Sequence, residues 1–430
     1  MVNAQQFPSL TTLQTVLKPP MEVWQPWLFS RLLIWVAMGL IAPNLPIANS
    51  VLAERLGWGV FLLGDGQWYG QIATAGYLQD AARQFPSVAF FPLYPILSAV
   101  LMQLGQMPFV FAGLLLNNLA FLLALTILYH WVTGRWNGTV AKWMIAAIAW
   151  FPLSLFGTLA DADGLFLLLN VVTLQSFSRG YYGLAAGFGA LATATRSMGL
   201  SLMPTLVSAA WQQRRSPLAY WAGGLSLIGF VLYSLYCGLR FGDLFAFDRA
   251  LAWLPQRPPS LLDWGAWGQT LLGGIVGPID PVTGRLQSIW YPIQFCLIEI
   301  SFFLIWRFKE LIRPMVRPWL VVSLMLWFWL LWPLGLVRTL TVVGGLYLFW
   351  NHRARLGVLL TNYTFWSLLW LAFSQSPLSP ERGIFAIVAL PIALGFWLAK
   401  RPYWRIPVVM GFSLMLFGTA VLVAQGQWVL

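Results

Sequence analysis

Residues Gly64 to Pro95 read GDGQWYGQIATAGYLQDAARQFPSVAFFPLYP, a polar interruption around which the rest of the chain is organised. The sequence on either side of this stretch consists almost entirely of apolar runs. The stretch itself opens with an aspartate, Asp65, between two glycines and is rich in aromatic residues and prolines. An ionisable group in such surroundings is a functional-site hypothesis by default, so we predict a site here and not a membrane span.

The composition excludes a water-soluble globular protein. Hydrophobic residues make up 59% of the 430 residues and charged residues only 9%, against about 25% charged residues in a typical soluble domain. We therefore predict an all-α, polytopic membrane protein with about thirteen transmembrane helices. Basic residues concentrate in the cytoplasmic loops of membrane proteins, which accounts for the net charge of +12, so we expect no nucleic-acid partner.

Apolar runs and basic turns divide the chain into three parts. We expect residues 1–26 to form a short cytoplasmic lead without a cleavable signal sequence. Residues 27–215 form a first membrane module, whose outer loop covers about 48–108. Residues 216–430 add further spans and a second outer loop at 240–288.

Basic and acidic residues are distributed unequally in this topology. Most Lys and Arg, Arg31 among them, are assigned to the cytoplasmic side, as the positive-inside rule requires. Asp65, Asp161 and Asp163 converge on the outer side. Acidic residues contribute little to orientation, so carboxylates gathered on one face need a functional explanation.

The first outer loop is predicted to hold two amphipathic pieces, Leu56–Ala75 and Phe90–Leu104. The second piece is shorter than the roughly 20 residues that a membrane-spanning helix needs. We therefore expect it to lie in the membrane interface beside the site.

Each aspartate also has a structural interpretation. Asp65 can cap the helix that follows it, because aspartate is a favoured N-cap residue. One of Asp161 and Asp163 can cap the helix that begins at Gly164 in the same way. The alternatives are acid–base partners, or ligands with a cation between them, because two adjacent buried carboxylates repel each other.

Two arginines are predicted at membrane depth or at the end of a span. An unpaired cation at the depth of Arg196 costs at least about 2.5 kcal/mol, so it either binds an anion such as a lipid phosphate or neutralises Asp161 or Asp163. Arg382 either holds a phosphate or is an interfacial anchor paired with Glu381.

An ordered series of short motifs in this chain resembles the PIG-V family of mannosyltransferases, which includes GPI mannosyltransferase II. The series is Asp65-Gly66-Gln67-Trp68-Tyr69, Ile72-Ala73, Gly76-Tyr77 and Ala89-Phe90-Phe91-Pro92-Leu93-Tyr94-Pro95. The segments Asp161–Phe166, Arg196–Gly199 and Ser379–Gly383 resemble later motifs of the family. The chain departs from the family's pattern at Gly64, where the family usually has Trp, and at Asp163, where it more often has Glu.

The resemblance implies a GT-C glycosyltransferase with hexosyltransferase, mannosyltransferase-like activity on the non-cytoplasmic face of a membrane, for which we expect a bacterial plasma membrane before an endoplasmic reticulum. The donor would be a polyprenyl-phosphate-linked sugar, the acceptor a glycan or a lipid-linked molecule, and the surroundings membrane lipids. The rival interpretation is a transporter or flippase for a lipid-linked or anionic substrate.

By the same resemblance, Asp65 is the general base that removes a proton from the acceptor hydroxyl during an inverting transfer. Arg196 and Arg382 bind the donor phosphate, because a phosphate leaving group needs cationic stabilisation. Side chains expected to support the acceptor are Asp161, Asp163, Trp68, Tyr69 and Tyr77, the aromatic ones through flat faces on which sugars stack. No residue is assigned as a metal ligand, and a divalent cation at the carboxylates is left open.

Overall fold

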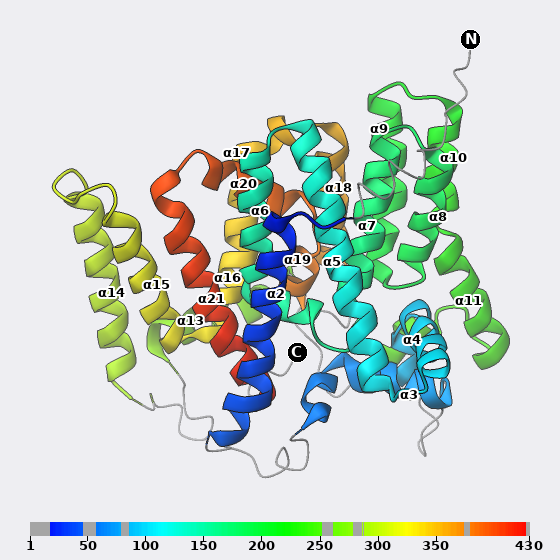
Figure 1. The fold of residues 1–430 in the computed structure, drawn as a ribbon, viewed down its shortest axis with the longest axis horizontal. Helices are drawn as coiled ribbons and strands as arrows, with labels where there is room; N and C mark the ends of the chain where they lie inside the picture. Colours follow the sequence, from blue (N-terminus) through cyan, green and yellow to red (C-terminus); the bar gives the residue numbers. More distant parts are fainter. Residues whose placement is uncertain are drawn as a thin grey trace.

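A computed structural model describes residues 18–45, 57–78, 86–251, 261–277, 286, 288–373 and 379–426. The secondary-structure elements of this part are all helices, as predicted from the sequence (Figure 1). Five helical stretches are long and apolar enough to cross a membrane: Met21–Asn44, Phe109–Arg135, Pro217–Phe241, Pro333–Leu356 and Pro402–Ala424. Shorter apolar helices accompany them. The chain is thus a multi-pass membrane protein, but thirteen spans are not seen among the described residues.

The α-helices of the described residues fall into two halves of the chain. Those in the first half are α2 (Met21–Val36), α3 (Asp65–Ala75), α4 (Leu93–Gly105), α5 (Phe109–Arg135), α6 (Gly138–Trp150), α7 (Asp163–Ser178), α8 (Tyr182–Thr193), α9 (Leu202–Gln212), α10 (Pro217–Leu225) and α11 (Ile228–Phe241). Those in the second half are α12 (Ala246–Ala250), α13 (Trp264–Val276), α14 (Trp290–Arg307), α15 (Arg317–Leu331), α16 (Pro333–Thr339), α17 (Gly345–Leu356), α18 (Val358–Phe373), α19 (Pro380–Phe385), α20 (Ala389–Ala399) and α21 (Pro402–Ala424).

Short 3₁₀ and π segments connect or extend the helices. The 3₁₀ segments include η2 (Ala42–Asn44), η4 (Trp58–Leu62), η5 (Pro86–Ala89), η6 (Pro152–Gly157) and η7 (Ser197–Ser201). The π segments are η1 (Ala37–Ile41), which continues α2, and η9 (Leu340–Gly344), which joins α16 to α17.

Two hydrophobic clusters make up the interior. The larger one joins α5 to α9 with α18 and α20, and includes Phe121, Phe166 and Tyr363. The smaller one joins α2, η4, η6, α16 and α21, and includes Phe61 and Phe156. Segments that carry the predicted site residues contribute to both clusters, so the site lies where the two clusters meet.

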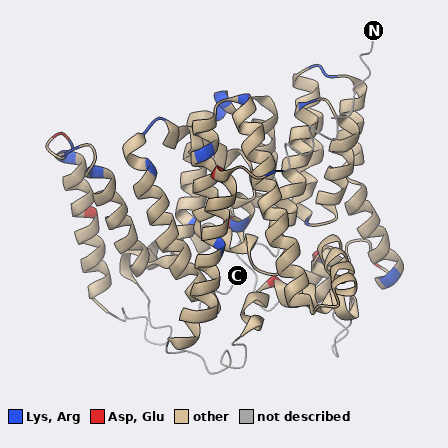
Figure 2. Ribbon diagram, in the orientation of Figure 1, with Lys and Arg blue, Asp and Glu red and all other residues tan. Residues whose placement is uncertain are grey.

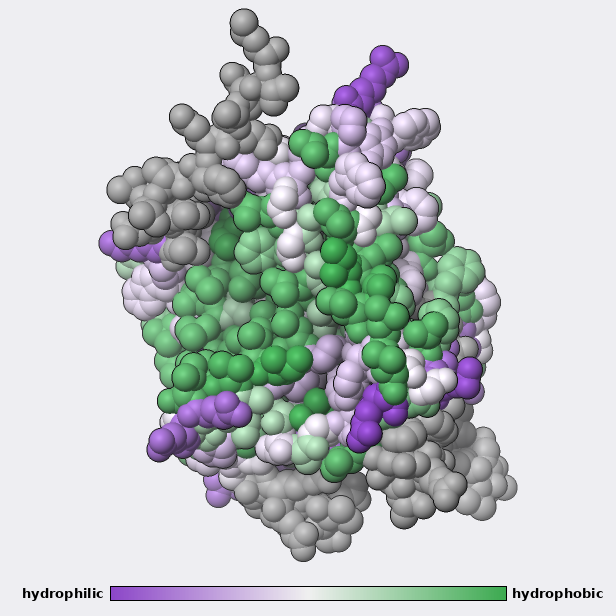
Figure 3. All heavy atoms as spheres, turned by 90° about the vertical axis from the view of Figure 1, so that its right-hand side faces the viewer, coloured by the Kyte–Doolittle hydropathy of each residue, from purple (hydrophilic) through white to green (hydrophobic). Residues whose placement is uncertain are grey.

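The distribution of charge along the long axis of the helices agrees with a membrane orientation. Lys and Arg gather at the turns α9–α10 and α20–α21 and at the end of α17, all at the upper end of the molecule in Figure 2, whereas α3 lies at the opposite end. The side view shows a broad hydrophobic belt with hydrophilic residues above and below it (Figure 3). Such a belt is the surface that a protein presents to lipid.

Several boundaries differ from the sequence prediction. Helix α2 begins at Met21, ahead of the expected start at Trp27. The sequence predicts a short span at 338–350, and in the structure this segment is part of the continuous stretch Pro333–Leu356, because η9 carries the helix onward without a break. The outer loop predicted at 240–288 contains two helices, α12 and α13. The expected helix Phe90–Leu104 is α4, which begins three residues later, after the Phe91-Pro92 step.

Candidate functional site

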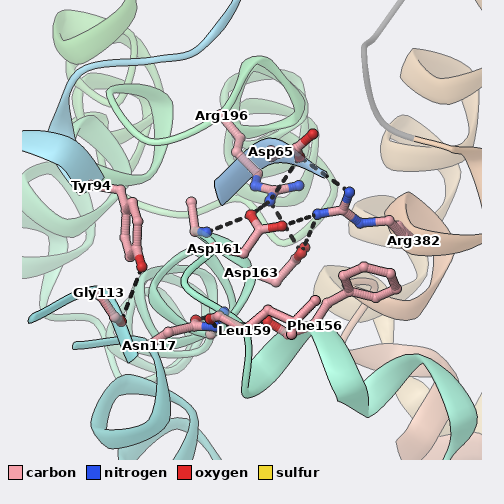
Figure 4. A network of polar contacts seen from close by, with 12 residues as sticks. Asp65, Tyr94, Gly113, Asn117, Phe156, Leu159, Asp161, Asp163, Arg196 and Arg382 are labelled. Atoms are coloured by element: carbon pink, nitrogen blue, oxygen red, sulfur yellow. Dashed lines mark hydrogen bonds and ion pairs between the residues drawn. The ribbon is translucent and has the colours of Figure 1, made fainter. Parts of the chain in front are cut away.

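Five charged side chains from four separate parts of the chain meet in one cluster (Figure 4). Asp65 is the first residue of α3, Asp161 lies in the turn before α7, and Asp163 is the first residue of α7. Arg196 lies between α8 and η7, and Arg382 lies in α19. All five are residues that the sequence marked as candidates, and we call them the aspartate–arginine cluster.

Each arginine of the cluster contacts all three carboxylates. The Nη2 atom of Arg382 donates to Asp161 Oδ2 and to Asp163 Oδ2, both at 2.6 Å, and its Nη1 donates to Asp65 Oδ2 at 3.1 Å. The Nη2 atom of Arg196 lies 2.6 Å from Asp161 Oδ1, 3.1 Å from Asp163 Oδ2 and 4.0 Å from Asp65 Oδ2. The carboxylates therefore face guanidinium groups, which removes the repulsion expected between them.

The cluster is buried, and its formal charge is minus one when all five groups are ionised. Burial raises the pKa of Asp161, which lies in the turn outside the long spans, to about 6, while the guanidinium of Arg382 acts in the opposite direction. The centroid of the Phe156 ring lies 4.1 Å from the Cζ atom of Arg382, a cation–π contact that adds to the ion pairs of this guanidinium.

Asp65 differs from the other two carboxylates. Its side chain is 12% exposed, against 2% for Asp161 and 9% for Asp163. Both oxygens of Asp161 accept hydrogen bonds, one of them also from the Ala162 backbone N–H at 2.6 Å. Only one oxygen of Asp65 accepts a hydrogen bond among the described residues. Asp163 is likewise contacted through one oxygen, Oδ2, so the greater exposure of Asp65 is what makes it the carboxylate most accessible to a bound molecule.

The glycines on either side of Asp65 have separate steric functions. Gly64 has a φ of +69°, a conformation that residues with a side chain rarely adopt. A Cβ atom on Gly66 would lie 3.0 Å from the carbonyl oxygen of Ala160. The Ala160 backbone N–H in turn donates to the carbonyl of Phe61 at 3.0 Å. The two glycines therefore let the start of α3 pack directly on the turn that carries Asp161.

The capping roles considered for the aspartates are wrong. Gly64 occupies the N-cap position of α3 and Ala162 that of α7, and neither helix has a side-chain hydrogen bond from its cap residue. The N-terminus of α7 is satisfied from another helix, because the Gly164 backbone N–H donates to Asn117 Oδ1 at 2.7 Å. The aspartates at these helix N-termini remain free to face the arginines, in a position where the helix dipole favours a negative charge.

Two asparagines of α5 hold the turn between η6 and α7. The Nδ2 atom of Asn117 donates to the carbonyls of Phe156 and Leu159, both at 2.7 Å, and that of Asn118 donates to Thr158 at 2.9 Å. Both asparagines are buried. No site role was predicted for either asparagine, although two adjacent asparagines within an apolar span are a recognisable signal.

Arg31 fixes the junction of α6 and η6 that precedes this turn, and it does so from within α2 and not from a basic loop. It lies within α2, buried, and donates to the carbonyls of Ser154 at 2.7 Å and Ala149 at 3.2 Å. It also donates to the Ser154 hydroxyl at 2.9 Å. The guanidinium thus satisfies the Ala149 carbonyl in the last turn of α6, which the helix itself leaves free, and the Ser154 carbonyl in η6.

The pairing of Arg382 with Glu381 is also wrong. The guanidinium of Arg382 faces the three aspartates, whereas Glu381 lies 4.0 Å from Arg338 of α16. Neighbouring residues of a helix point in directions about 100° apart, so α19 presents the two side chains to different surroundings.

The aromatic candidates pack beside the cluster. The Trp68 ring stacks on Phe90 with centroids 5.9 Å apart, and Tyr69 is buried against the edges of Phe90 and Tyr94. The Tyr77 hydroxyl donates to the Phe90 carbonyl at 2.8 Å. All three therefore fix the segment before α4.

A largely apolar groove of about 720 Å³ begins beside Arg196. Its walls come from η7, α11, α12, α18 and the segment before α4, with Phe91, Phe230 and Trp370 among the aromatic residues. Ser197, the residue directly after Arg196, is part of the wall. The groove can hold an apolar ligand, and Ser197 links its wall to the aspartate–arginine cluster through the adjacent Arg196.

A divalent cation does not fit the cluster as it is arranged. No group of three or more His, Cys, Asp or Glu side chains among the described residues is placed to hold a metal ion. The guanidinium groups occupy the space between the carboxylates where a shared cation would sit. The two arginines thus supply the positive charge that a metal would otherwise bring.

Comparison with known proteins yields structural likeness alone. No protein-family model and no curated protein matches the sequence. Among solved structures, the chain is similar to the oligosaccharyltransferase of Archaeoglobus fulgidus complexed with Zn and sulfate (TM-score 0.43, 12% identity, 94% of this chain and 52% of that one). It is likewise similar to the apo form (TM-score 0.44, 13% identity, 95% and 56%) and to the complex of the oligosaccharyltransferase AglB with an inhibitory peptide and a dolichol-phosphate (TM-score 0.43, 13% identity, 94% and 55%). The chain spans about half the length of these proteins, and a likeness this distant carries no functional argument.

Proposed function

We propose that the protein is an integral-membrane glycosyltransferase that transfers a sugar from a polyprenyl-phosphate-linked donor to an acceptor hydroxyl. The motifs that resemble the PIG-V family support a mannosyltransferase-like activity on the non-cytoplasmic face. The resemblance is independent of the geometry, and both support the same residues. A candidate general base, a cation that can bind phosphate and a groove that can hold a lipid chain lie in one part of the molecule.

The proposal rests on the unpartnered guanidinium nitrogens of Arg196. Its Nη2 atom faces the aspartates, but its Nε and Nη1 atoms are buried and have no hydrogen-bond partner among the described residues. Buried guanidinium donors without partners are unfavourable, which leaves Arg196 prepared to bind an anion. Because the next residue, Ser197, lines the apolar groove, that anion is best explained as the phosphate of a lipid whose chain lies in the groove.

The reaction follows from these positions. Asp65 accepts the proton of the acceptor hydroxyl while the hydroxyl oxygen forms a bond to the anomeric carbon of the donor. The bond between that carbon and the phosphate oxygen breaks, and the lipid phosphate leaves with the electron pair. Arg196, with Arg382 behind it, stabilises the negative charge that develops on the phosphate. Attack opposite the leaving group inverts the configuration at the anomeric carbon.

Asp161 and Asp163 support the arginines in this scheme. With both its oxygens occupied by donors, Asp161 has little capacity to bind a substrate, so its role is to fix the two guanidinium groups. Asp163 Oδ2 lies between the same two guanidinium groups. Trp68, Tyr69 and Tyr77 support the site indirectly, because they contact Phe90 and so fix the segment that borders the groove.

The test is sugar transfer by the Asp65→Asn variant in detergent or nanodiscs, with polyprenyl-phosphate mannose, glucose and arabinose as donors. We expect kcat/KM to fall by about 10²–10⁴-fold with an unchanged melting temperature, because asparagine keeps the shape of the side chain but accepts no proton. Asp243→Asn is the matched control, since Asp243 pairs with Arg249 at the surface. Full activity of Asp65→Asn would refute the role of Asp65, and a wild-type protein that moves these lipids without forming product would favour the transporter.

A further inference from the structure

A second buried group of charged residues lies next to the aspartate–arginine cluster. Arg338, near the end of α16, and Glu381 of α19 approach each other to 4.0 Å between Nε and Oε2, and their side chains are 12% and 11% exposed. The ring of Trp267 from α13 lies 4.6 Å from the Arg338 Cζ atom. We call these three residues the Arg338 pocket. None of them takes part in the reaction described above.

The charged atoms of the Arg338 pocket are not satisfied by the protein. Arg338 Nε and Nη2 and Glu381 Oε2 are buried and have no hydrogen-bond partner among the described residues. Arg338 Nη1 makes only a long contact of 3.5 Å to the Thr270 hydroxyl. A buried ion pair that serves packing alone is expected to close, as the contacts of 2.6 Å in the neighbouring cluster do. Arg338 Nε and Glu381 Oε2 instead remain 4.0 Å apart.

The local backbone explains why the pair stays open. The π segment η9 begins two residues after Arg338 and packs against α19. Its first turn is fixed by the Thr341 hydroxyl, which donates to the Val337 carbonyl at 2.7 Å. π segments inside helices occur frequently at functional sites. With the Trp267 ring against the guanidinium, Arg338 has little freedom to move toward Glu381.

The charges of the Arg338 pocket select the kind of ligand. An anion would meet the carboxylate of Glu381, and a cation would meet the guanidinium of Arg338, so neither type of ion suits the gap. A hydroxyl group suits it, because it donates to the carboxylate and accepts from the guanidinium at once. A neutral molecule with several hydroxyl groups satisfies all three unpartnered atoms.

We propose that the Arg338 pocket binds hydroxyl groups of a neutral pyranose in the acceptor, which rests on the proposed function. The placement supports it. Glu381 and Arg382 are adjacent in α19, so their Cα atoms are about 3.8 Å apart. A sugar held by Glu381 therefore lies beside the helix that presents Arg382 to Asp65. Helix α13, which brings Trp267, lies at the same end of the molecule as α3 in Figure 1.

The experiment is saturation-transfer NMR on the full chain in nanodiscs, with methyl α-D-mannopyranoside and methyl α-D-glucopyranoside as probes. We expect binding of at least one probe to the wild-type protein. We expect Arg338→Met and Glu381→Gln each to weaken it about tenfold, as for the loss of a hydrogen bond to a charged group. Arg401→Met is the matched control, because Arg401 also lies 4.6 Å from a tryptophan ring, Trp397, but at the basic end of the molecule. If Arg338→Met fails to fold, Glu381→Gln decides, because it keeps the shape of the side chain.

The outcomes separate this inference from the proposed function. Absence of binding by the wild-type protein, or equal binding by wild type, Arg338→Met and Glu381→Gln, refutes the Arg338 pocket even where Asp65→Asn abolishes transfer. Binding of inorganic phosphate that depends on Arg338 also refutes it, because the ligand is then an anion. A melting temperature lowered in both variants with unchanged probe binding shows a structural ion pair. If probe binding depends on Arg338 but the protein transfers no sugar, the Arg338 pocket is supported as a sugar-binding site and the proposed transferase activity is refuted.

Discussion

Replacing Asn117 by alanine tests how the turn that carries Asp161 and Asp163 is held in place. The change removes two donated hydrogen bonds, to the carbonyls of Phe156 and Leu159, and one acceptor, for the Gly164 backbone N–H. All three contacts are 2.7 Å long, and Asn117 is fully buried. Each buried group left without its partner costs about 1–3 kcal/mol, so we expect a loss of about 3–9 kcal/mol in unfolding free energy.

The assay is unfolding by SDS in mixed micelles, followed by tryptophan fluorescence. Asn170→Ala is the matched control, because Asn170 is equally buried but donates only to the Phe166 carbonyl within its own helix. This control loses a similar side-chain volume and one local hydrogen bond, so we expect about 1–3 kcal/mol. Equal losses for the two variants would refute the view that Asn117 holds the turn, as would an Asn117→Ala protein that keeps full transfer activity.

Three further predictions concern the cluster itself. Arg196→Met should raise the KM for the lipid-phosphate donor by at least about tenfold, because it removes a charged donor; an unchanged donor KM in steady-state kinetics would make Arg196 a structural partner of Asp161. Gly164→Ala should destabilise the protein in the same SDS assay, since the new Cβ atom would lie 2.5 Å from Asn117 O and Oδ1, whereas Gly183→Ala, where nothing lies within 4 Å, should not. EDTA should leave transfer unchanged, because arginines occupy the space between the carboxylates, and activity restored only by a divalent cation would contradict this.

The sequence predicted the helices well where apolar runs end at basic turns. The sequence predicts spans at 109–131 and 289–306, and α5 and α14 end close to these positions, at Arg135 and Arg307. The sequence also predicts two short helices hinged near Arg196-Ser197, and in the structure α8 ends at Thr193 and η7 begins at Ser197. The π segment η9 could not be predicted, since its residues are as apolar as those of a regular helix.

The sequence also brought the right side chains together but could not say what each one contacts. Asp65, Asp161 and Arg196 were assigned to one side from topology, and they do meet. The capping role, by contrast, was assigned from local preference, whereas the partner that satisfies α7 lies 47 residues away in Asn117. Arg31 was counted with the basic turns for the same reason. Local sequence gives no sign that a distant carbonyl needs a donor.

The energetics of the aspartate–arginine cluster favour a chemical role over a structural one. Burying five charges removes each from water at a cost of several kcal/mol, and well-packed apolar residues in their place are often neutral or stabilising. The surrounding structure supports the cluster at two consecutive places: Asn117 and Asn118 of α5 hold the turn between η6 and α7, and Arg31 of α2 holds the junction of α6 and η6 before it. Neither α5 nor α2 needs these polar side chains for its own helix. Three buried polar residues thus fix the chain between α6 and α7, which sets the position of Asp161 and Asp163 and, through Arg382, that of Asp65.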